Sequence, residues 1–258
     1  MTILRRATAA LLGSLIALSS GAAVADTLRG TDGSDTLVGT PGPDTLVARA
    51  GDDLVRGRGA EDILYGGAGN DRMWGGLGAD LLYGGRGGDI LTGGAGPDLL
   101  RGGKSTDHLS GGTGHDAMFG RAGRDFIDGG GGDDEIHGGR HSDNLAGGHG
   151  DDSVYGGPGS DYLTDTDIGS PGPDGVDSYV PKDTDLLVGG RGDDIIAVLA
   201  GRDRVRAGGG DDEIKLFGDD ASVDRIRCGT GMDTVRYFAV ADPDDVIAED
   251  CERVVVEK

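Results

Sequence analysis

Residues 66–74 read Gly66-Gly67-Ala68-Gly69-Asn70-Asp71-Arg72-Met73-Trp74, a unit of the form G-G-x-G-x-D-x-U-x in which U is aliphatic. From Asp26 to Asp161 an Asp stands at every ninth residue without a miss. An aliphatic residue follows each Asp by two positions, and a glycine nearly always precedes it by five. Chance does not produce such a series, so the chain is predicted to be an array of one repeated structural unit.

The composition excludes several classes of protein. Glycine accounts for 54 of the 258 residues and aromatic residues for 4 %, which is too little apolar volume for the core of an ordinary globular enzyme. The formal net charge of −22 disfavours nucleic acid and anionic membranes as partners, because both require a basic surface. The charge favours cations instead.

The first 25 residues resemble a secretory signal peptide. Arg5 and Arg6 form a short basic start, residues 7–18 are apolar, and Ala23-Val24-Ala25 fits the small-x-small rule for cleavage. The Arg pair alone would also suit twin-arginine export, which the surrounding residues do not support. The apolar stretch is too short for a stable transmembrane helix, and no other apolar run occurs, so a secreted chain without a transmembrane segment is predicted.

The spacing slips after Leu163. Residues 169–177 form a degenerate copy of the unit, and the nine-residue period resumes at Asp185 and runs to Asp212, with two further copies after an insertion. The predicted organisation is a signal peptide at 1–25, regular repeats at 26–164, degenerate repeats with short insertions at 165–236 and a C-terminal cap at 237–258.

Each unit has a simple physical interpretation. The residues x-U-x form a short strand whose middle side chain points inward. The glycine-rich part then reverses the chain, because glycine adopts positive φ without steric cost. Two units make one turn of 18 residues, and successive turns stack as parallel strands around a thin aliphatic core.

Stacking places each Asp beside the matching loop of the next turn, where a row of carboxylates repels. A hard divalent cation removes that repulsion, and glycine-rich loops expose the carbonyl oxygens that complete an all-oxygen shell. Calcium accepts such irregular geometry better than magnesium does. The predicted calcium ligands are Asp35, Asp44, Asp53, Asp62, Asp71, Asp80, Asp89, Asp98, Asp107, Asp116, Asp125, Asp134, Asp143, Asp152, Asp161, Asp185, Asp194, Asp203 and Asp212.

The repeat resembles the hemolysin-type, or RTX, calcium-binding nonapeptide, whose signature is G-G-x-G-x-D-x-U-x. The resemblance implies a parallel β-roll in which calcium lies between loops, held by the Asp carboxylate and by loop carbonyls. Some loops depart from the pattern, which puts their sites in question. The departures are Ala48, Arg49, Ala60, Ser105 and His141 in place of glycines, and the loop of Asp224, which has none.

Cys228 and Cys251 are the only cysteines. A disulfide between them would close a loop of about 23 residues, stabilise the fold by roughly 3 kcal/mol and clasp the C-terminal segment over the open end of the roll. The alternative is a metal or redox pair, although the spacing fits no such motif.

The outward residue after U, taken every 18 residues, forms a stripe of mostly flat side chains. We define this aromatic stripe as Tyr65, Tyr83, Arg101, Phe119, His137 and Tyr155. One interpretation is packing between turns that stiffens the sheet. The other is a face that docks polysaccharide or protein, with Tyr65, Tyr83, Phe119 and Tyr155 as its contacts. The five histidines occupy different repeat positions and are interpreted as variable surface residues rather than one ligand set.

The sequence thus predicts an all-β protein: a parallel β-roll (β-solenoid) with two repeats per turn and a small disulfide-clasped cap. Its predicted function is calcium binding coupled to folding, in a secreted, non-catalytic, structural or adhesive protein. No Ser/His/Asp group and no H-E-x-x-H pattern occurs. The alternatives are a polysaccharide- or protein-binding module that uses the aromatic stripe, and an extracellular enzyme whose chemistry lies in the roll or its insertion.

Overall fold

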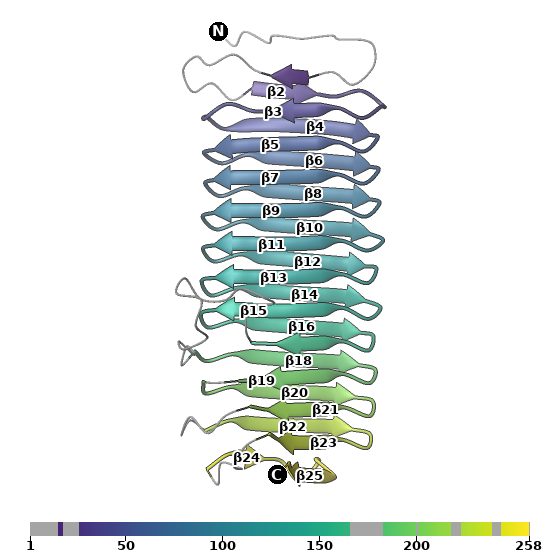
Figure 1. The fold of residues 1–258 in the computed structure, drawn as a ribbon, viewed down its shortest axis with the longest axis vertical. Helices are drawn as coiled ribbons and strands as arrows, with labels where there is room; N and C mark the ends of the chain where they lie inside the picture. The colour runs from purple at the N-terminus through teal and green to yellow at the C-terminus, as the bar shows by residue number, and fades with distance from the viewer. Residues whose placement is uncertain are drawn as a thin grey trace. The chain divides into compact units, whose positions relative to one another are not determined.

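A computed structural model of the chain describes residues 15–17, 26–165, 183–199, 201–217, 223–238 and 244–257. The chain divides into two compact units, Met1–Ala117 and Met118–Lys258. Every regular element in the described residues is a β-strand (Figure 1), and these residues contain no helix that is long and apolar enough to cross a membrane. The degenerate repeat predicted at 169–177 lies outside the described residues.

The first unit consists of two parallel sheets, with strand orders β1-β3-β5-β7-β9-β11 and β2-β4-β6-β8-β10. Strand β1 falls inside the segment predicted to be a signal peptide. The strands are β1 (Leu15–Ala17), β2 (Asp26–Arg29), β3 (Thr36–Val38), β4 (Asp44–Ala50), β5 (Leu54–Gly59), β6 (Ile63–Ala68), β7 (Arg72–Leu77), β8 (Leu81–Arg86), β9 (Ile90–Ala95), β10 (Leu99–Lys104) and β11 (His108–Thr113).

The second unit repeats the arrangement, with strand orders β13-β15-β17-β19-β21-β23-β25 and β12-β14-β16-β18-β20-β22-β24. The strands are β12 (Ala117–Ala122), β13 (Phe126–Gly131), β14 (Glu135–Arg140), β15 (Asn144–His149), β16 (Ser153–Pro158), β17 (Tyr162–Thr164), β18 (Leu186–Arg191), β19 (Ile195–Val198), β20 (Arg204–Gly209), β21 (Glu213–Leu216), β22 (Arg225–Thr230), β23 (Thr234–Tyr237), β24 (Val246–Ile247) and β25 (Arg253–Val256). Strands β24 and β25 lie in the segment predicted to be a cap, and they pair in parallel with β22 and β23.

Each unit is a parallel β-solenoid, as the repeat predicted. In the regular repeats a residue pairs with the one 18 positions later, for example Met73 with Leu91. The aliphatic residue of each repeat points into the core, and Leu64, Met73 and Leu82 have no exposed surface. Because equivalent aliphatic residues of successive turns stack on each other, the core of each unit is a pair of aliphatic ladders. Alternation of inward and outward residues along short strands is enough to form them, so the sequence needs no long apolar runs.

The strands are longer than the three residues predicted. Most span six, because the two glycines and the residue after them continue the ladder, as in the pairing of Gly103 with Gly85 and of Lys104 with Arg86. Gly103 has φ +134°, and a side chain there would collide with the carbonyl oxygen of Gly85. Glycine is therefore needed to let neighbouring turns approach closely, and the chain reverses within only three residues, such as 69–71.

Candidate metal centre

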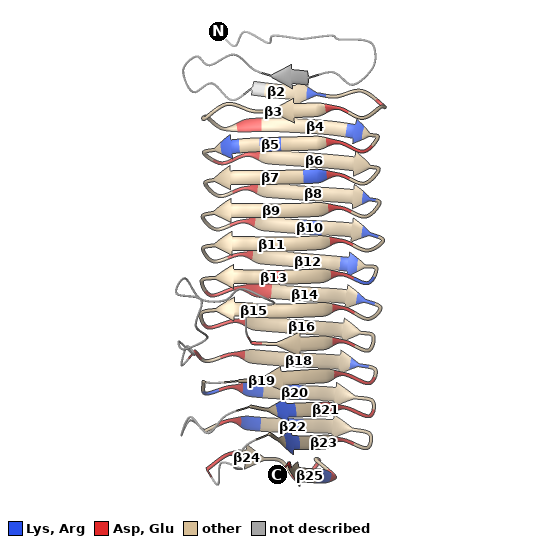
Figure 2. Ribbon diagram, viewed as in Figure 1, with Lys and Arg blue, Asp and Glu red and all other residues tan. Residues whose placement is uncertain are grey.

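The repeated Asp residues lie where the strands begin, and their side chains are buried. Figure 2 shows acidic residues at the loops that join successive strands in each unit. All predicted calcium ligands are at most 5 % exposed. They form two rows in each unit, which we name after one member. The first unit has the Asp53 row (Asp35, Asp53, Asp71, Asp89, Asp107) and the Asp62 row (Asp44, Asp62, Asp80, Asp98, Asp116). The second unit has the Asp143 row (Asp125, Asp143, Asp161, Asp194, Asp212) and the Asp152 row (Asp134, Asp152, Asp185, Asp203).

Within each row the carboxylates bind to the neighbouring turn. One oxygen, Oδ1, accepts a hydrogen bond from the backbone N–H of the preceding Asp in the row. The N···O distances are 2.7–2.9 Å in the first unit and 2.7–2.9 Å in the second. This bond orients every carboxylate in the same way, so the geometry of one loop is repeated along the row.

The second oxygen, Oδ2, is buried without a hydrogen-bond partner in many of these residues. Examples are Asp53, Asp62, Asp71, Asp80, Asp89 and Asp98 in the first unit and Asp143, Asp152, Asp161, Asp194 and Asp212 in the second. A buried carboxylate oxygen without a partner is costly, and its regular recurrence indicates a shared ligand rather than an isolated defect.

These oxygens face a small space beside the first glycine of their own loop. A Cβ atom at Gly156 would lie 2.5 Å from Oδ2 of Asp161 and 2.6 Å from the carbonyl oxygen of Gly189 in the next turn. The same pair of oxygens surrounds Gly39, at 2.6 Å from Asp44 Oδ2 and 2.6 Å from the Gly57 carbonyl. Carboxylate and carbonyl oxygens thus converge beside the first glycine of the loop, so closely that a Cβ atom would collide with them. An all-oxygen donor set of this kind suits calcium.

The electrostatics of the rows indicate the same ligand. The pKa of Asp62, Asp98 and Asp143 is raised to about 7, mainly by burial and also by the carboxylates of neighbouring turns, while the backbone hydrogen bond to each carboxylate acts in the opposite direction. The pKa of Asp152 and of Asp185 is raised to about 8 by the same causes. A cation between the carboxylates would stabilise their charged forms and reverse these shifts.

The geometry defines a parallel β-roll with repeated, all-oxygen cation sites. The family model described as RTX calcium-binding nonapeptide repeat (4 copies) matches residues 29–64, 56–91, 83–118, 111–140, 137–164 and 183–214. The chain belongs to this RTX calcium-binding repeat family. RTX nonapeptides bind calcium, and the regularly spaced buried Asp residues fit multiple calcium sites. No curated protein matches the chain.

The rows extend beyond the ligands that were predicted. Asp224 accepts from the N–H of Asp203, Asp245 from that of Asp224, and Asp233 from that of Asp212, at 2.9–3.0 Å. Glu252 then accepts from the N–H of Asp233 at 2.8 Å. The sequence carried a signal for Asp245 and Glu252. Asp245 is followed two residues later by Ile247, and Glu252 by Val254, as in the D-x-U part of the repeat.

The irregular loops of the first unit keep the regular backbone. Arg49, Ala60 and Ser105 replace glycines and still have φ of 90°, 64° and 83°. In the second unit His141 does the same at 80°. These residues occupy the left-handed region that glycine normally fills, so the stacking of neighbouring turns imposes the loop conformation on them at a local cost in strain.

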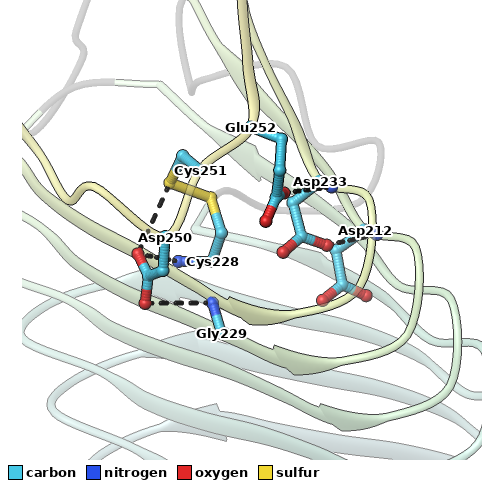
Figure 3. The surroundings of a disulfide bond; sticks show 7 residues. All are labelled: Asp212, Cys228, Gly229, Asp233, Asp250, Cys251 and Glu252. Atoms are coloured by element: carbon cyan, nitrogen blue, oxygen red, sulfur yellow. Dashed lines mark hydrogen bonds between the residues drawn. A yellow bond between two sulfur atoms is a disulfide. The ribbon is translucent and has the colours of Figure 1, made fainter.

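The predicted disulfide is present. Cys228 and Cys251 are bonded, with their Cα atoms 5.1 Å apart (Figure 3). Cys228 is buried in β22 at the position of the first glycine of a repeat. The adjacent Asp250 accepts hydrogen bonds from the N–H groups of Cys228 and Gly229, at 3.3 and 3.2 Å. The bond and these contacts hold the chain before β25 against the preceding turn.

The aromatic stripe consists of stacked rings within each unit. Tyr65 and Tyr83 stack with ring centroids 5.0 Å apart, and the Arg101 guanidinium lies 5.5 Å from the Tyr83 ring. In the second unit, His137 stacks between Phe119 and Tyr155 at 4.9 and 4.7 Å. This confirms that the side chains lie side by side. Their mutual stacking contributes to packing between turns, and whether they also dock a partner stays a prediction.

Proposed function

We propose that the chain is a secreted, non-catalytic calcium-binding protein whose folding is coupled to calcium and which serves a structural or adhesive role outside the cell. The observation that carries the proposal is the recurring buried Oδ2 oxygen, which faces a glycine carbonyl of the next turn. Without a cation these rows oppose folding, and with one they join each turn to the next, so that binding free energy becomes folding free energy.

Two further features support an extracellular setting. Residues 1–25 fit a signal peptide, and a disulfide persists in oxidising compartments. Calcium is abundant enough outside the cell to fill weak sites. The non-catalytic assignment is supported by the carboxylates themselves, because they are buried and their Oδ1 oxygens accept hydrogen bonds from backbone N–H groups. Calcium-dependent turnover of an extracellular polysaccharide or of casein would contradict it.

The test is far-UV circular dichroism during a calcium titration of the calcium-free protein, with magnesium as the control. We expect strand signal to appear cooperatively with calcium and to stay low with magnesium, since magnesium dehydrates reluctantly and demands a smaller, octahedral site. A calcium-free chain that is already folded, and that calcium does not change, would overturn the coupling of folding to calcium.

A second candidate function is recognition of a polysaccharide or protein by the aromatic stripe. It is favoured by the stacking of flat rings within each unit and by Tyr65, which is 41 % exposed. The double variant Tyr65→Ala/Tyr83→Ala should lose retention on immobilised polysaccharides while its calcium titration stays unchanged. The matched control is Tyr162→Ala, because Tyr162 is similarly exposed, at 39 %, and lies outside the stripe. Equal retention of both variants would reject this candidate.

A further inference from the structure

One acidic side chain of the second unit lies where the regular repeat has glycine. Asp165 follows strand β17 and aligns with Gly147 of the preceding turn, since Thr164 pairs with Ala146. A side chain at Gly147 would lie 2.5 Å from Oδ2 of Asp152, so this backbone position projects a side chain directly at the carboxylate row. At residue 165 the chain places a carboxylate in that direction.

Asp165 forms a cluster with two members of the Asp152 row. One carboxylate oxygen from each of Asp165, Asp185 and Asp203 lies within 4.8 Å of the others, and all three residues are buried. Within the described residues this is the one group of three or more acidic, His or Cys ligands that meets this distance. The distance is short enough for a single cation to bind all three carboxylates.

The Asp165 carboxylate is only partly satisfied by the protein. The side chain is 4 % exposed, and its Oδ2 accepts a hydrogen bond from the N–H of Leu199 at 2.6 Å. Its Oδ1 is buried and has no hydrogen-bond partner. Burial raises the pKa of Asp165 well above its usual range, and the charged groups that add to this effect are the carboxylates of Asp203 and Asp185. A buried oxygen without a partner, surrounded by like charge, points to a ligand of positive charge.

The loop that ends at Asp203 differs from the regular loops in a way that favours a third carboxylate ligand beside Asp185 and Asp203. The loop that ends at Asp203 has Val198 at the first glycine position, and this side chain is 2 % exposed. Its apolar side chain fills space that the regular loops leave to oxygen atoms. Asp165 supplies an additional anionic oxygen from the turn before.

We infer that Asp165, Asp185 and Asp203 hold one calcium ion in a site of their own, which binds more tightly than the regular loop sites because three carboxylates converge on it. The inference rests on the proposal that the loops bind calcium through Asp. Affinity for calcium rises with the number of charged ligands, so this site should fill first. Asp165 and Asp185 lie on either side of residues 166–182 in the sequence, so the ion would also join the two ends of that insertion.

The test is a calorimetric calcium titration of the full chain and of two variants. Asp165→Asn removes the charge and keeps the shape, and Asp165→Gly restores the residue that the regular repeat has at this position. Asp193→Asn is the matched control, because Asp193 is an exposed loop acid of the same unit whose hydrogen bond from the N–H of Asp211, at 2.8 Å, an Asn can keep. Folding of each variant is checked by circular dichroism at saturating calcium.

We expect the native chain and Asp193→Asn to show one tight site followed by weaker sites. In Asp165→Asn and Asp165→Gly the tight site should weaken by about tenfold or more while the weaker sites remain. An unchanged tight class in the Asp165→Gly protein would overturn the inference, whether or not the Asn variant folds. A native chain that binds no calcium at all would instead refute the general function, so the two failures are distinguishable.

Discussion

The regular loops of the first unit and the last turns of the second unit differ in the residue at the first position of the loop. In the first unit the first position of loops such as 57–62 and 93–98 is glycine, and oxygen atoms surround it. In the turns that follow Asp152 in the second unit, that position is taken by side chains that are at most 4 % exposed: Asp165, Val198, Leu216 and Tyr237. Apart from Asp165, which we infer to be a calcium ligand, these side chains fill with apolar atoms the space that carboxylate and carbonyl oxygens surround in the regular loops.

Other contacts of these last turns need no metal. Phe217 and Phe238 stack at 4.6 Å, and Arg236 binds Glu213 and Glu257 at 2.5 and 2.8 Å. The disulfide adds a covalent link between neighbouring turns. A repeat fold can therefore replace metal-dependent contacts by apolar packing and cross-links in its last turns, and calcium dependence should differ along the chain.

Calcium removal should have the largest effect. A site saturated a hundredfold above its dissociation constant contributes about 2.7 kcal/mol, so losing several sites exceeds the stability of a typical domain, about 5–15 kcal/mol. In hydrogen exchange after chelation, strands β5–β10 should lose protection, while β20–β23 should keep more of it. Equal loss of protection in both regions would contradict a difference in calcium dependence between them.

Acidification of the calcium-free protein should have the next largest effect. The folded-state pKa values of Asp62, Asp98, Asp152 and Asp185 are about 7 to 8, against an ordinary value of 3.8. The folded state therefore binds more protons than the unfolded state between about pH 4 and 8, and its stability falls as pH rises through that window. Strand signal in calcium-stripped buffer should be higher near about pH 4.5 than at about pH 8, and a rise with pH would contradict this.

With saturating calcium the pH dependence should reverse, because protons compete with the cation for the same carboxylates.

The variant Asp152→Asn tests whether the pH dependence of the calcium-free protein arises from the carboxylates of the Asp152 row. It removes one of the carboxyls with a pKa of about 8, so it should raise the strand signal of the calcium-free protein at about pH 8 and flatten its pH dependence.

The third largest effect should come from a substitution at the first glycine of a loop, and two glycines of strand β13 allow a direct test. A methyl group at Gly129 would collide with the carbonyl oxygen of Gly147 and lie 2.5 Å from Asp134 Oδ2, whereas nothing lies within 4 Å of one at Gly131. Gly129→Ala should lower the free energy of unfolding by about 3 kcal/mol and weaken calcium binding. Gly131→Ala should change it by less than about 0.5 kcal/mol. Chemical denaturation in calcium measures both, and equal effects would show that the first glycine position is not special.

The sequence predicted the solenoid, its aliphatic core and the rows of stacked Asp residues, because a strict nine-residue period repeats the same local environment. It underestimated strand length, since glycines such as Gly103 were assigned to the turn although they continue the parallel ladder. It also did not single out Asp165 as a ligand. The alignment of Asp165 with Gly147 depends on strand pairing across an irregular part of the chain, which spacing along the sequence does not define.

The smallest effect concerns the strained loops of the first unit. Ser105 has φ +83° and an exposed side chain, so its conformation costs about 1–2 kcal/mol relative to an ordinary one. Ser105→Gly relieves this strain and loses part of the gain to the greater freedom of glycine in the unfolded chain, which leaves a net stabilisation of about 0.5 kcal/mol. Ser105→Ala is the control, because it removes the hydroxyl and keeps the strain. Denaturation in saturating calcium should rank the Gly variant above both the native chain and the Ala variant. If the Ala variant were as stable as the Gly variant, the hydroxyl rather than the backbone would be the cause, and stacked turns would not impose strain on the irregular loops.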